Sequence, residues 1–169
     1  MRSMLFVPGD RPERFAKALA SGADAVICDL EDAVTPVTRP QARLNVADWL
    51  RTTGRSIPLW VRINPVQTDD ALPDLTAVAA ARPDGIVLPK ARSGADLHRL
   101  DHWLEALEVQ HGLAYGSIKV LALITETANA VLSGSSFTTP PARVIGYTWG
   151  AEDLAADVGA SANRTADGE

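Results

Sequence analysis

Charged residues follow five short apolar runs of this chain, and their types are those that enzymes use for acid, base and metal chemistry. They are Asp29, Arg62, Lys90, Glu126 and Asp153. Consecutive members lie 27 to 36 residues apart, close to the roughly 30 residues of a strand-helix-strand unit. Parallel α/β barrels build their active sites at the carboxyl ends of the strands. We therefore expect these charges to meet at one mouth.

Glu126 and Asp153 are the candidate metal ligands. Carboxylates at the ends of neighbouring parallel strands can reach one hard cation, and Mg²⁺ commonly takes only one or two protein carboxylates. In the alternative interpretation, Glu126 caps the helix that follows it and Asp153 lies in a solvated turn. Spacing alone leaves both interpretations open.

Two more carboxylates, Glu31 and Asp32, follow the apolar run that ends at Asp29. They are expected near the same mouth, where they could hydrogen-bond metal-bound waters and orient the site. Asp29 itself is expected to accept hydrogen bonds from loop amides.

Arg62 closes the run Trp60 to Arg62 and offers two parallel donors for a carboxylate. It could also stabilise negative charge that develops on oxygen. An ion pair with Glu31 or Asp32 is the alternative, and the two roles are compatible.

Lys90 could form a Schiff base, but among so many acids we expect a charge-balancing ammonium. The amides of Gly150, Ala151, Glu152 and Asp153 could cradle an oxyanion if the turn curls into a nest. His98, His102 and His111 lie on or beside one helix, away from the strand ends, so a histidine-centred metal site or triad is disfavoured.

Strands and helices are predicted to alternate along the chain. Apolar runs predict strands at 4–7, 25–29, 58–63, 85–88, 118–124 and 144–149. Helical spacing predicts helices from Pro12 to Ala20, at 41–52, at 74–81 and from a cap at 93–96 to a stop before Gly112. The expected fold is an α/β (β/α)₈ TIM barrel with about six of its eight units, in a single domain over residues 1–169. A complete barrel typically needs about 250 residues, so we expect this one to be incomplete and to end in a polar tail at 163–169.

Composition favours small-molecule chemistry. The 169 residues are 46% hydrophobic and carry a net charge of −5, with no Lys/Arg block to bind nucleic acid or a membrane surface. The only cysteine, Cys28, lies in an apolar run, where we expect a small buried hydrophobe. A chain without an internal disulfide fits a reducing cytoplasm. We also expect no membrane span and no signal peptide.

Six motifs, in order, resemble those of the citrate lyase β-subunit-like proteins in the HpcH/HpaI aldolase superfamily. They occupy residues 2–9, 29–34, 61–64, 88–90, 124–127 and 150–159. The resemblance implies a (β/α)₈ barrel that is usually oligomeric, often trimeric, and that uses Mg²⁺ to cleave or form C–C bonds in acyl thioesters of 3-hydroxy acids.

The resemblance also implies roles for single residues. Glu126 and Asp153 match the metal ligands, and Arg62 matches the arginine that contacts the oxoacid. Glu31 and Asp32 match groups near metal-bound water. Arg14 and Lys17 resemble basic residues near the phosphates of coenzyme A.

The implied activity is a Mg²⁺-dependent carbon-carbon lyase that converts citryl-, malyl- or citramalyl-CoA into an acyl-CoA and a 2-oxoacid. One alternative is the β subunit of citrate lyase, which acts on citryl-acyl carrier protein with α and γ subunits as partners. Another is a non-catalytic truncated barrel that binds metal and oxoacid. Relatives continue with two strands and a carboxy-terminal segment that lends an acidic residue to a neighbouring subunit, and these 169 residues contain neither.

Overall fold

A six-stranded parallel sheet forms the centre of the protein, seen in a computed structural model that describes residues 2–164. The strands are hydrogen-bonded in the order in which they occur in the chain, from β1 to β6. Their bounds are β1 Met4–Pro8, β2 Ala25–Asp29, β3 Leu59–Arg62, β4 Gly85–Leu88, β5 Lys119–Leu123 and β6 Val144–Thr148. All six predicted strands are present within two residues of their expected bounds, and the part of the predicted tail at 165–169 lies outside the described residues.

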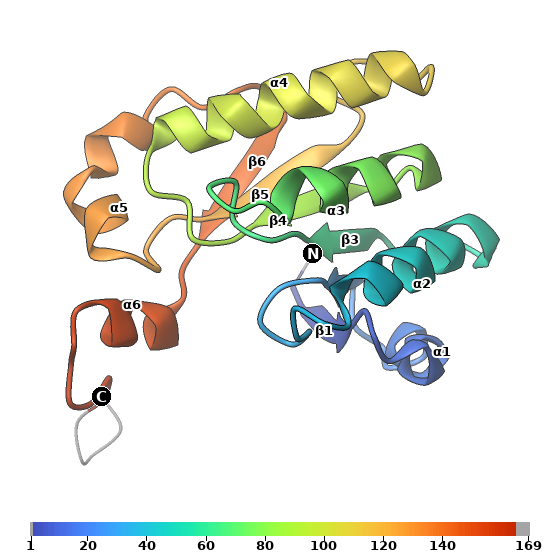
Figure 1. The fold of residues 1–169 in the computed structure, drawn as a ribbon, viewed down its shortest axis with the longest axis horizontal. Helices are drawn as coiled ribbons and strands as arrows, with labels where there is room; N and C mark the ends of the chain where they lie inside the picture. The colour runs from blue at the N-terminus through green and yellow to red at the C-terminus, as the bar shows by residue number, and fades with distance from the viewer. Residues whose placement is uncertain (1, 165–169) are drawn as a thin grey trace.

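Helices follow the strands in the chain, and the first four of them cover one face of the sheet (Figure 1). Their bounds are α1 Phe15–Leu19, α2 Arg39–Thr52, α3 Ala71–Val78, α4 Gly94–Gln110, α5 Ala128–Leu132 and α6 Ala151–Asp157. Short 3-10 segments flank them: η1 Pro12–Arg14, η2 Ala79–Ala81 and η3 Gly134–Phe137. A strand order that follows the chain, with helical crossovers on one side, is the arrangement of a (β/α) barrel. The predicted fold class is confirmed.

Two helix predictions were inaccurate in detail. The first helix begins at Pro12 as expected, but its first turn is 3-10 and the α-helical part ends at Leu19. The helix predicted from Asp74 begins three residues earlier, at Ala71. Helix α4 starts after Ser93 as predicted, although the Ser93 side chain makes no cap hydrogen bond. Asp96 instead accepts the N–H of Arg92 at 2.7 Å.

The alternation of side chains along each strand separates two apolar clusters. The larger cluster lies between the sheet and the helices and includes Val26, Cys28 and Val61. The smaller one contains Ile27, Trp60 and Val87 and lies on the opposite face, which corresponds to the inside of a barrel. Because Asp29 and Arg62 follow this alternation, their side chains share the inner face at the carboxyl ends of β2 and β3, where the two residues are paired in register.

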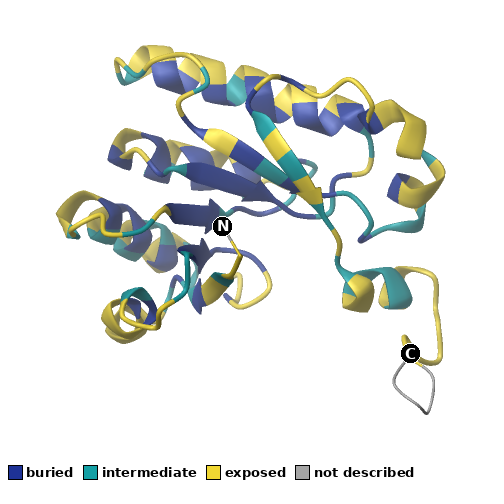
Figure 2. Cartoon of the chain, turned by 180° about the vertical axis from the view of Figure 1, so that it is seen from behind, coloured by how far each residue is buried: buried dark blue, intermediate teal, exposed yellow. Residues whose placement is uncertain are grey.

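Burial decreases toward the edges of the sheet. The four strands β2 to β5 are largely buried, whereas β6 alternates between half-buried and exposed residues (Figure 2). Cys28 is fully buried in β2, as expected for a small apolar side chain. Desolvation raises the pKa of its thiol, followed by a smaller contribution from the Asp29 charge.

Among residues 2–164, no helix combines the length and apolar character that crossing a membrane requires.

Candidate active site

The predicted charged residues meet at the carboxyl end of the sheet. Arg62 forms a bidentate pair with Asp29: Nε donates to Oδ1 and Nη2 to Oδ2, each at 2.7 Å. Asp29 also accepts the backbone N–H groups of Glu31 and Ala33 at 3.0 Å. The predicted role of Asp29 as an acceptor for loop amides is confirmed, and its pairing with Arg62 is an additional contact that the sequence did not indicate.

Arg62 has a second anionic neighbour. Its Nη1 lies 3.2 Å from Glu31 Oε2, so the alternative ion pair is present, with Glu31 as the partner. Its guanidinium also lies over the Phe6 ring, 4.8 Å from the centroid. Although burial acts to lower the pKa of Arg62, hydrogen bonding and charge from Asp29 raise it above the usual value. The side chain is therefore a permanently charged and firmly oriented donor.

Lys90 lies among three carboxylates. Its Nζ is 2.5 Å from Glu31 Oε1, 3.0 Å from Asp32 Oδ2 and 3.2 Å from Asp153 Oδ1. Burial opposes the shift, but hydrogen bonds to Glu31 and Asp32 raise the pKa of Lys90. A Schiff-base nucleophile needs a neutral amine, so this geometry agrees with the predicted charge-balancing ammonium.

Glu126 is the more buried of the two candidate metal ligands, with 2% of its surface exposed. Its Oε2 accepts the backbone N–H of Lys90 at 2.6 Å. Burial first, and then the neighbouring Asp153 and Glu31 carboxylates, raise the pKa of Glu126 to about 7, although the hydrogen bond from the Lys90 amide acts to lower it. Two like charges are thus held side by side in a partly desolvated position.

The alternative in which Glu126 caps the next helix is wrong. Thr127 occupies the N-cap of α5, and its hydroxyl accepts the N–H of Ala130 at 3.1 Å. Asp153 does not lie in a solvated turn either, because it belongs to the first turn of α6, is only half-exposed and pairs with Lys90.

The residues present suit a hard divalent cation. Glu126, Asp153 and Lys90 line a cavity of about 480 Å³ together with Thr68 and Gln67. Within residues 2–164 no group of three or more His, Cys, Asp or Glu side chains is arranged to hold a metal ion. Two carboxylates beside an open cavity nevertheless fit Mg²⁺, which usually keeps waters or substrate oxygens as its other ligands.

A buried oxygen of Glu31 also suits this chemistry. Its Oε2 accepts no hydrogen bond from the described residues, since the contact with Arg62 lacks hydrogen-bond geometry. Burial raises the pKa of Glu31, and Lys90 and Arg62 offset part of this effect. The side chain of Asp32 is about half exposed, and it contacts Lys90 at the rim. Its pKa is lowered, because hydrogen bonding and charge from Lys90 outweigh the opposing effect of burial.

The loop before α6 contributes a close backbone approach. A Cβ on Gly150 would lie 2.7 Å from both Cγ and Oε1 of Glu126. The predicted nest does not form: Gly150 has φ −133° and Ala151 is already the first residue of α6. The amides of residues 151 to 153 therefore belong to a helical first turn.

Two predicted site residues lie elsewhere. Arg14 and Lys17 are exposed and line a separate cavity of about 590 Å³ between α1 and β1, with Leu5 and Phe6. They are not in contact with the carboxylates. His98 and His102 are exposed on α4, as expected.

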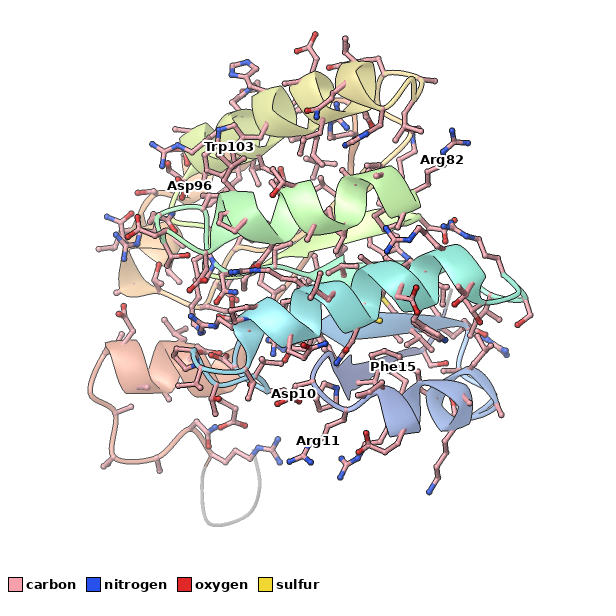
Figure 3. All side chains as sticks on the ribbon, turned by 45° about the vertical axis from the view of Figure 1, so that its right-hand side comes forward. Asp10, Arg11, Phe15, Arg82, Asp96 and Trp103 are labelled. Carbon is pink, nitrogen blue, oxygen red and sulfur yellow. The ribbon has the colours of Figure 1, made fainter. Side chains whose placement is uncertain are left out.

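Sequence reasoning missed the support of the loop that carries Lys90. Asp96, in the first turn of α4 (Figure 3), accepts Gln67 Nε2 at 2.6 Å as well as the Arg92 amide. Asp157 of α6 accepts the N–H of Ala128 at 2.7 Å and so connects α6 to the start of α5. The acid three residues after Ser93 is a recognisable capping signal, whereas no local pattern marks Asp157.

Comparison with known proteins assigns the family. A family profile described as HpcH/HpaI aldolase/citrate lyase matches residues 2–168. This chain belongs to the HpcH/HpaI aldolase/citrate lyase family. The resemblance drawn from the six motifs is thereby confirmed.

Members of the family with related sequences include a citrate lyase subunit beta-like protein of Mycobacterium tuberculosis, 39% identical over 164 residues, with 97% of this chain and 52% of that protein covered. The L-malyl-CoA/beta-methylmalyl-CoA lyase of Cereibacter sphaeroides is 34% identical, with 94% and 50% covered. The chain thus spans about half the length of these curated relatives.

A solved family structure has the same fold. The citrate lyase beta subunit from M. tuberculosis, complexed with oxaloacetate and magnesium, matches with a TM-score of 0.79 and 39% identity, over 98% of this chain and 65% of that one. Protein CitE from the same organism, in complex with magnesium, acetoacetate and coenzyme A, also matches at 0.79, with 38% identity and 98% and 54% covered.

Proposed function

We propose that this chain carries the metal and oxoacid site of a Mg²⁺-dependent carbon-carbon lyase acting on a 3-hydroxyacyl-CoA thioester. The observation that carries the proposal is the pair Glu126 and Asp153, two adjacent carboxylates that line an open cavity with Lys90, whose ammonium shares Glu31 with Arg62. Support comes from family membership and from relatives solved with magnesium, oxaloacetate and coenzyme A.

Glu126 and Asp153 would hold the cation, which when bound would polarise the oxygens of a 2-oxoacid as a Lewis acid. Arg62 would stabilise the negative charge that develops on the thioester oxygen when the C–C bond breaks and its electron pair moves into the departing enolate. Asp29 would keep the guanidinium in place through the bidentate pair. A base would accept the proton of the substrate hydroxyl in the same step.

Glu31 would orient the entering molecules. Its Oε2, which lies in ion-pair distance of Arg62 but accepts no hydrogen bond from the described residues, would accept one from a water or substrate hydroxyl, and Asp32 would act at the rim of the same mouth. Gly150 keeps the backbone close to Glu126, and we assign Gly150 and Ala151 to substrate contact. Arg14 and Lys17 are proposed to attract the phosphates of coenzyme A from the neighbouring cavity.

The direct test is calorimetric titration of oxaloacetate, glyoxylate and pyruvate into the protein with and without Mg²⁺. Wild type should bind at least one oxoacid only when Mg²⁺ is present, and Glu126→Gln and Asp153→Asn should each abolish this binding. Glu105→Gln, which neutralises an exposed acid on α4, should bind as wild type does. Absence of Mg²⁺-dependent binding in wild type would reject the proposal.

A second measurement separates the alternatives. Release of the 2-oxoacid from citryl-, malyl- or citramalyl-CoA would support a CoA-ester lyase. Release only from citryl-acyl carrier protein would favour a citrate lyase β subunit. A relative from Haemophilus influenzae with that name is 35% identical to this chain. Oxoacid binding without turnover of any thioester would favour a non-catalytic barrel. Oligomeric state, including the trimer that the resemblance implies, is read from the same sample by light scattering.

A further inference from the structure

One residue, Lys90, contacts four of the five carboxylates of the proposed site. Its Nζ pairs with Glu31, Asp32 and Asp153, at 2.5 to 3.2 Å, and its backbone N–H donates to Glu126. The chain contains two other lysines, Lys17 and Lys119.

The backbone around Lys90 is built to hold this position. Lys90 has φ +49°, in the left-handed region that residues with a Cβ rarely adopt. The conformation is kept by hydrogen bonds at Lys90 and at the two residues after it: the Lys90 N–H donates to Glu126, Ala91 donates to the carbonyl of Leu123 at 3.2 Å, and Arg92 donates to Asp96. A strained backbone held by its surroundings is a feature of functional sites.

The ammonium occupies the same negative field that would attract a metal ion. It lies 3.2 Å from an oxygen of Asp153, one of the two proposed ligands. A divalent cation bound between Glu126 and Asp153 would therefore be close to a positive charge, and the two cations repel each other at this range. Without the metal, the same ammonium offsets the mutual repulsion of the carboxylates.

We propose that Lys90 is a positioning residue that sets the affinity of this site for divalent cations, standing in for the cation in its absence and competing with it for Asp153. The inference rests on the proposed function, which assigns Glu126 and Asp153 as ligands. Removal of the Lys90 charge should therefore strengthen Mg²⁺ binding, whereas removal of a residue that only supports the site should weaken it.

The test is a Mg²⁺ titration in the absence of substrate, at low ionic strength, on wild type and Lys90→Met. We expect Lys90→Met to bind Mg²⁺ roughly tenfold more tightly, a factor that corresponds to about 1.4 kcal/mol. The matched control is Lys119→Met, which removes a lysine charge at the amino end of β5, away from the site. Within the described residues, Lys119 Nζ bonds only the carbonyl of Gly116, so this variant should change the Mg²⁺ affinity less than twofold. Lys90→Arg should behave as wild type does, because it keeps the charge.

Thermal unfolding supplies a second readout. Lys90→Met without metal should unfold at a lower temperature than wild type, since its carboxylates lose their counter-charge, and Mg²⁺ should raise its unfolding temperature by more than it does in wild type. If Lys90→Met does not fold without metal, added Mg²⁺ should restore cooperative unfolding. Failure of Mg²⁺ to restore folding would overturn the inference.

The outcomes separate the two proposals. Equal or weaker Mg²⁺ binding by a folded Lys90→Met, beside normal binding by wild type, overturns the role of Lys90 and leaves the proposed function intact. Binding by neither protein overturns both. Binding by both proteins, tighter in Lys90→Met, supports the inference and the proposed function together.

Discussion

Individual carboxylates in the site differ in how their charge is compensated. Asp29 is paired with Arg62, and Glu31 and Asp32 with Lys90. Glu126 has no ion pair with Lys, Arg or His anywhere in residues 2–164 and receives only the Lys90 amide. A buried carboxylate whose charge is not compensated is unfavourable in the folded protein. A cation bound between Glu126 and Asp153 would supply the missing positive charge, and this supports the proposed metal-binding role.

Gly150→Ala is predicted to weaken Mg²⁺ binding without changing any charge. The added Cβ would lie 2.7 Å from Glu126 Oε1, so either the side chain or the loop must move. We expect at least a tenfold loss of Mg²⁺ affinity by calorimetry. Gly134→Ala is the matched control, because a Cβ there meets no atom within 4 Å. Unchanged affinity in Gly150→Ala would show that Glu126 does not hold the cation in this orientation.

Arg62→Lys is predicted to lose oxoacid binding although it keeps the positive charge. Lysine cannot reproduce the bidentate pair with Asp29 that orients the guanidinium. We expect a tenfold or greater loss in affinity for the oxoacid in the presence of Mg²⁺, and little change in Mg²⁺ binding alone. Arg51→Lys, at an exposed position of α2, should match wild type. Equal oxoacid binding by Arg62→Lys would remove Arg62 from the site.

At the scale of elements, a buried ionic network joins α4 to β5 and β6, the two strands that precede the proposed metal ligands. Arg143, just before β6, donates to Asp101 at 2.5 Å and to both oxygens of Glu108 at 2.9 and 3.0 Å. Glu108 also accepts the N–H groups of Gly116 and Ile118, before β5, at 2.9 Å. This network fixes the amino ends of β5 and β6 against α4.

Glu108→Gln is predicted to destabilise the protein by about 3 kcal/mol, because breaking a buried pair leaves part of the Arg143 charge uncompensated. Urea unfolding at pH 7 measures the change. Glu105→Gln, one turn earlier and exposed on the same helix, should alter stability by less than about 0.5 kcal/mol. A comparable loss in both variants would mean that helix α4 responds to any charge removal.

The contribution of Glu108 should also depend on pH. Burial acts to raise its pKa, but Arg143 and the two amides outweigh this and leave the pKa below its usual value of 4.5. A lowered acid pKa stabilises the folded state above the unfolded pKa, and the effect is lost as pH falls through the folded value. The stability difference between wild type and Glu108→Gln should therefore be constant near neutrality and shrink below about pH 4.5. A difference that grows in acid would contradict this assignment.

At the scale of the whole molecule, the sheet is open. In the described residues β1 and β6 each pair with one neighbour only, and apolar side chains are exposed on both, including Phe6 on β1 and Ile145 and Tyr147 on β6. Figure 2 shows this exposure along β6. Unpaired strand edges with apolar side chains favour association.

We therefore predict that the 169-residue chain associates in solution or is poorly stable. Light scattering after size exclusion should give a mass above that of a monomer at micromolar concentration. Ile145→Lys should reduce association, because a charge on an edge strand disfavours pairing. Val37→Lys, in an exposed loop away from both edges, should have no effect. A stable monomer with sharp cooperative unfolding would contradict the prediction.

The strand ends were accessible from the sequence because they depend on local patterns. Apolar runs that end in a charge located five of the six strands, and the apolar run before Pro8 located the first. Parallel pairing then required Asp29, Arg62, Lys90, Glu126 and Asp153 to share one end of the sheet. The helix bounds were predicted less exactly: α3 begins at Ala71 rather than Asp74, and the first turn of the first helix is 3-10 rather than α-helical. Such ends depend on tertiary contacts as well as on local propensity.

The sequence by itself determined the order of the elements, the side of the sheet that carries the charges and the family to which the motifs belong. Only the tertiary structure decided the pairing: that Asp29 rather than Asp32 holds Arg62, that Thr127 rather than Glu126 caps α5, and that Arg14 and Lys17 face another cavity. The physical reason is that these contacts join residues far apart in the chain. They depend on strand register, side-chain direction and burial, and the left-handed backbone of Lys90 leaves no mark in the local sequence.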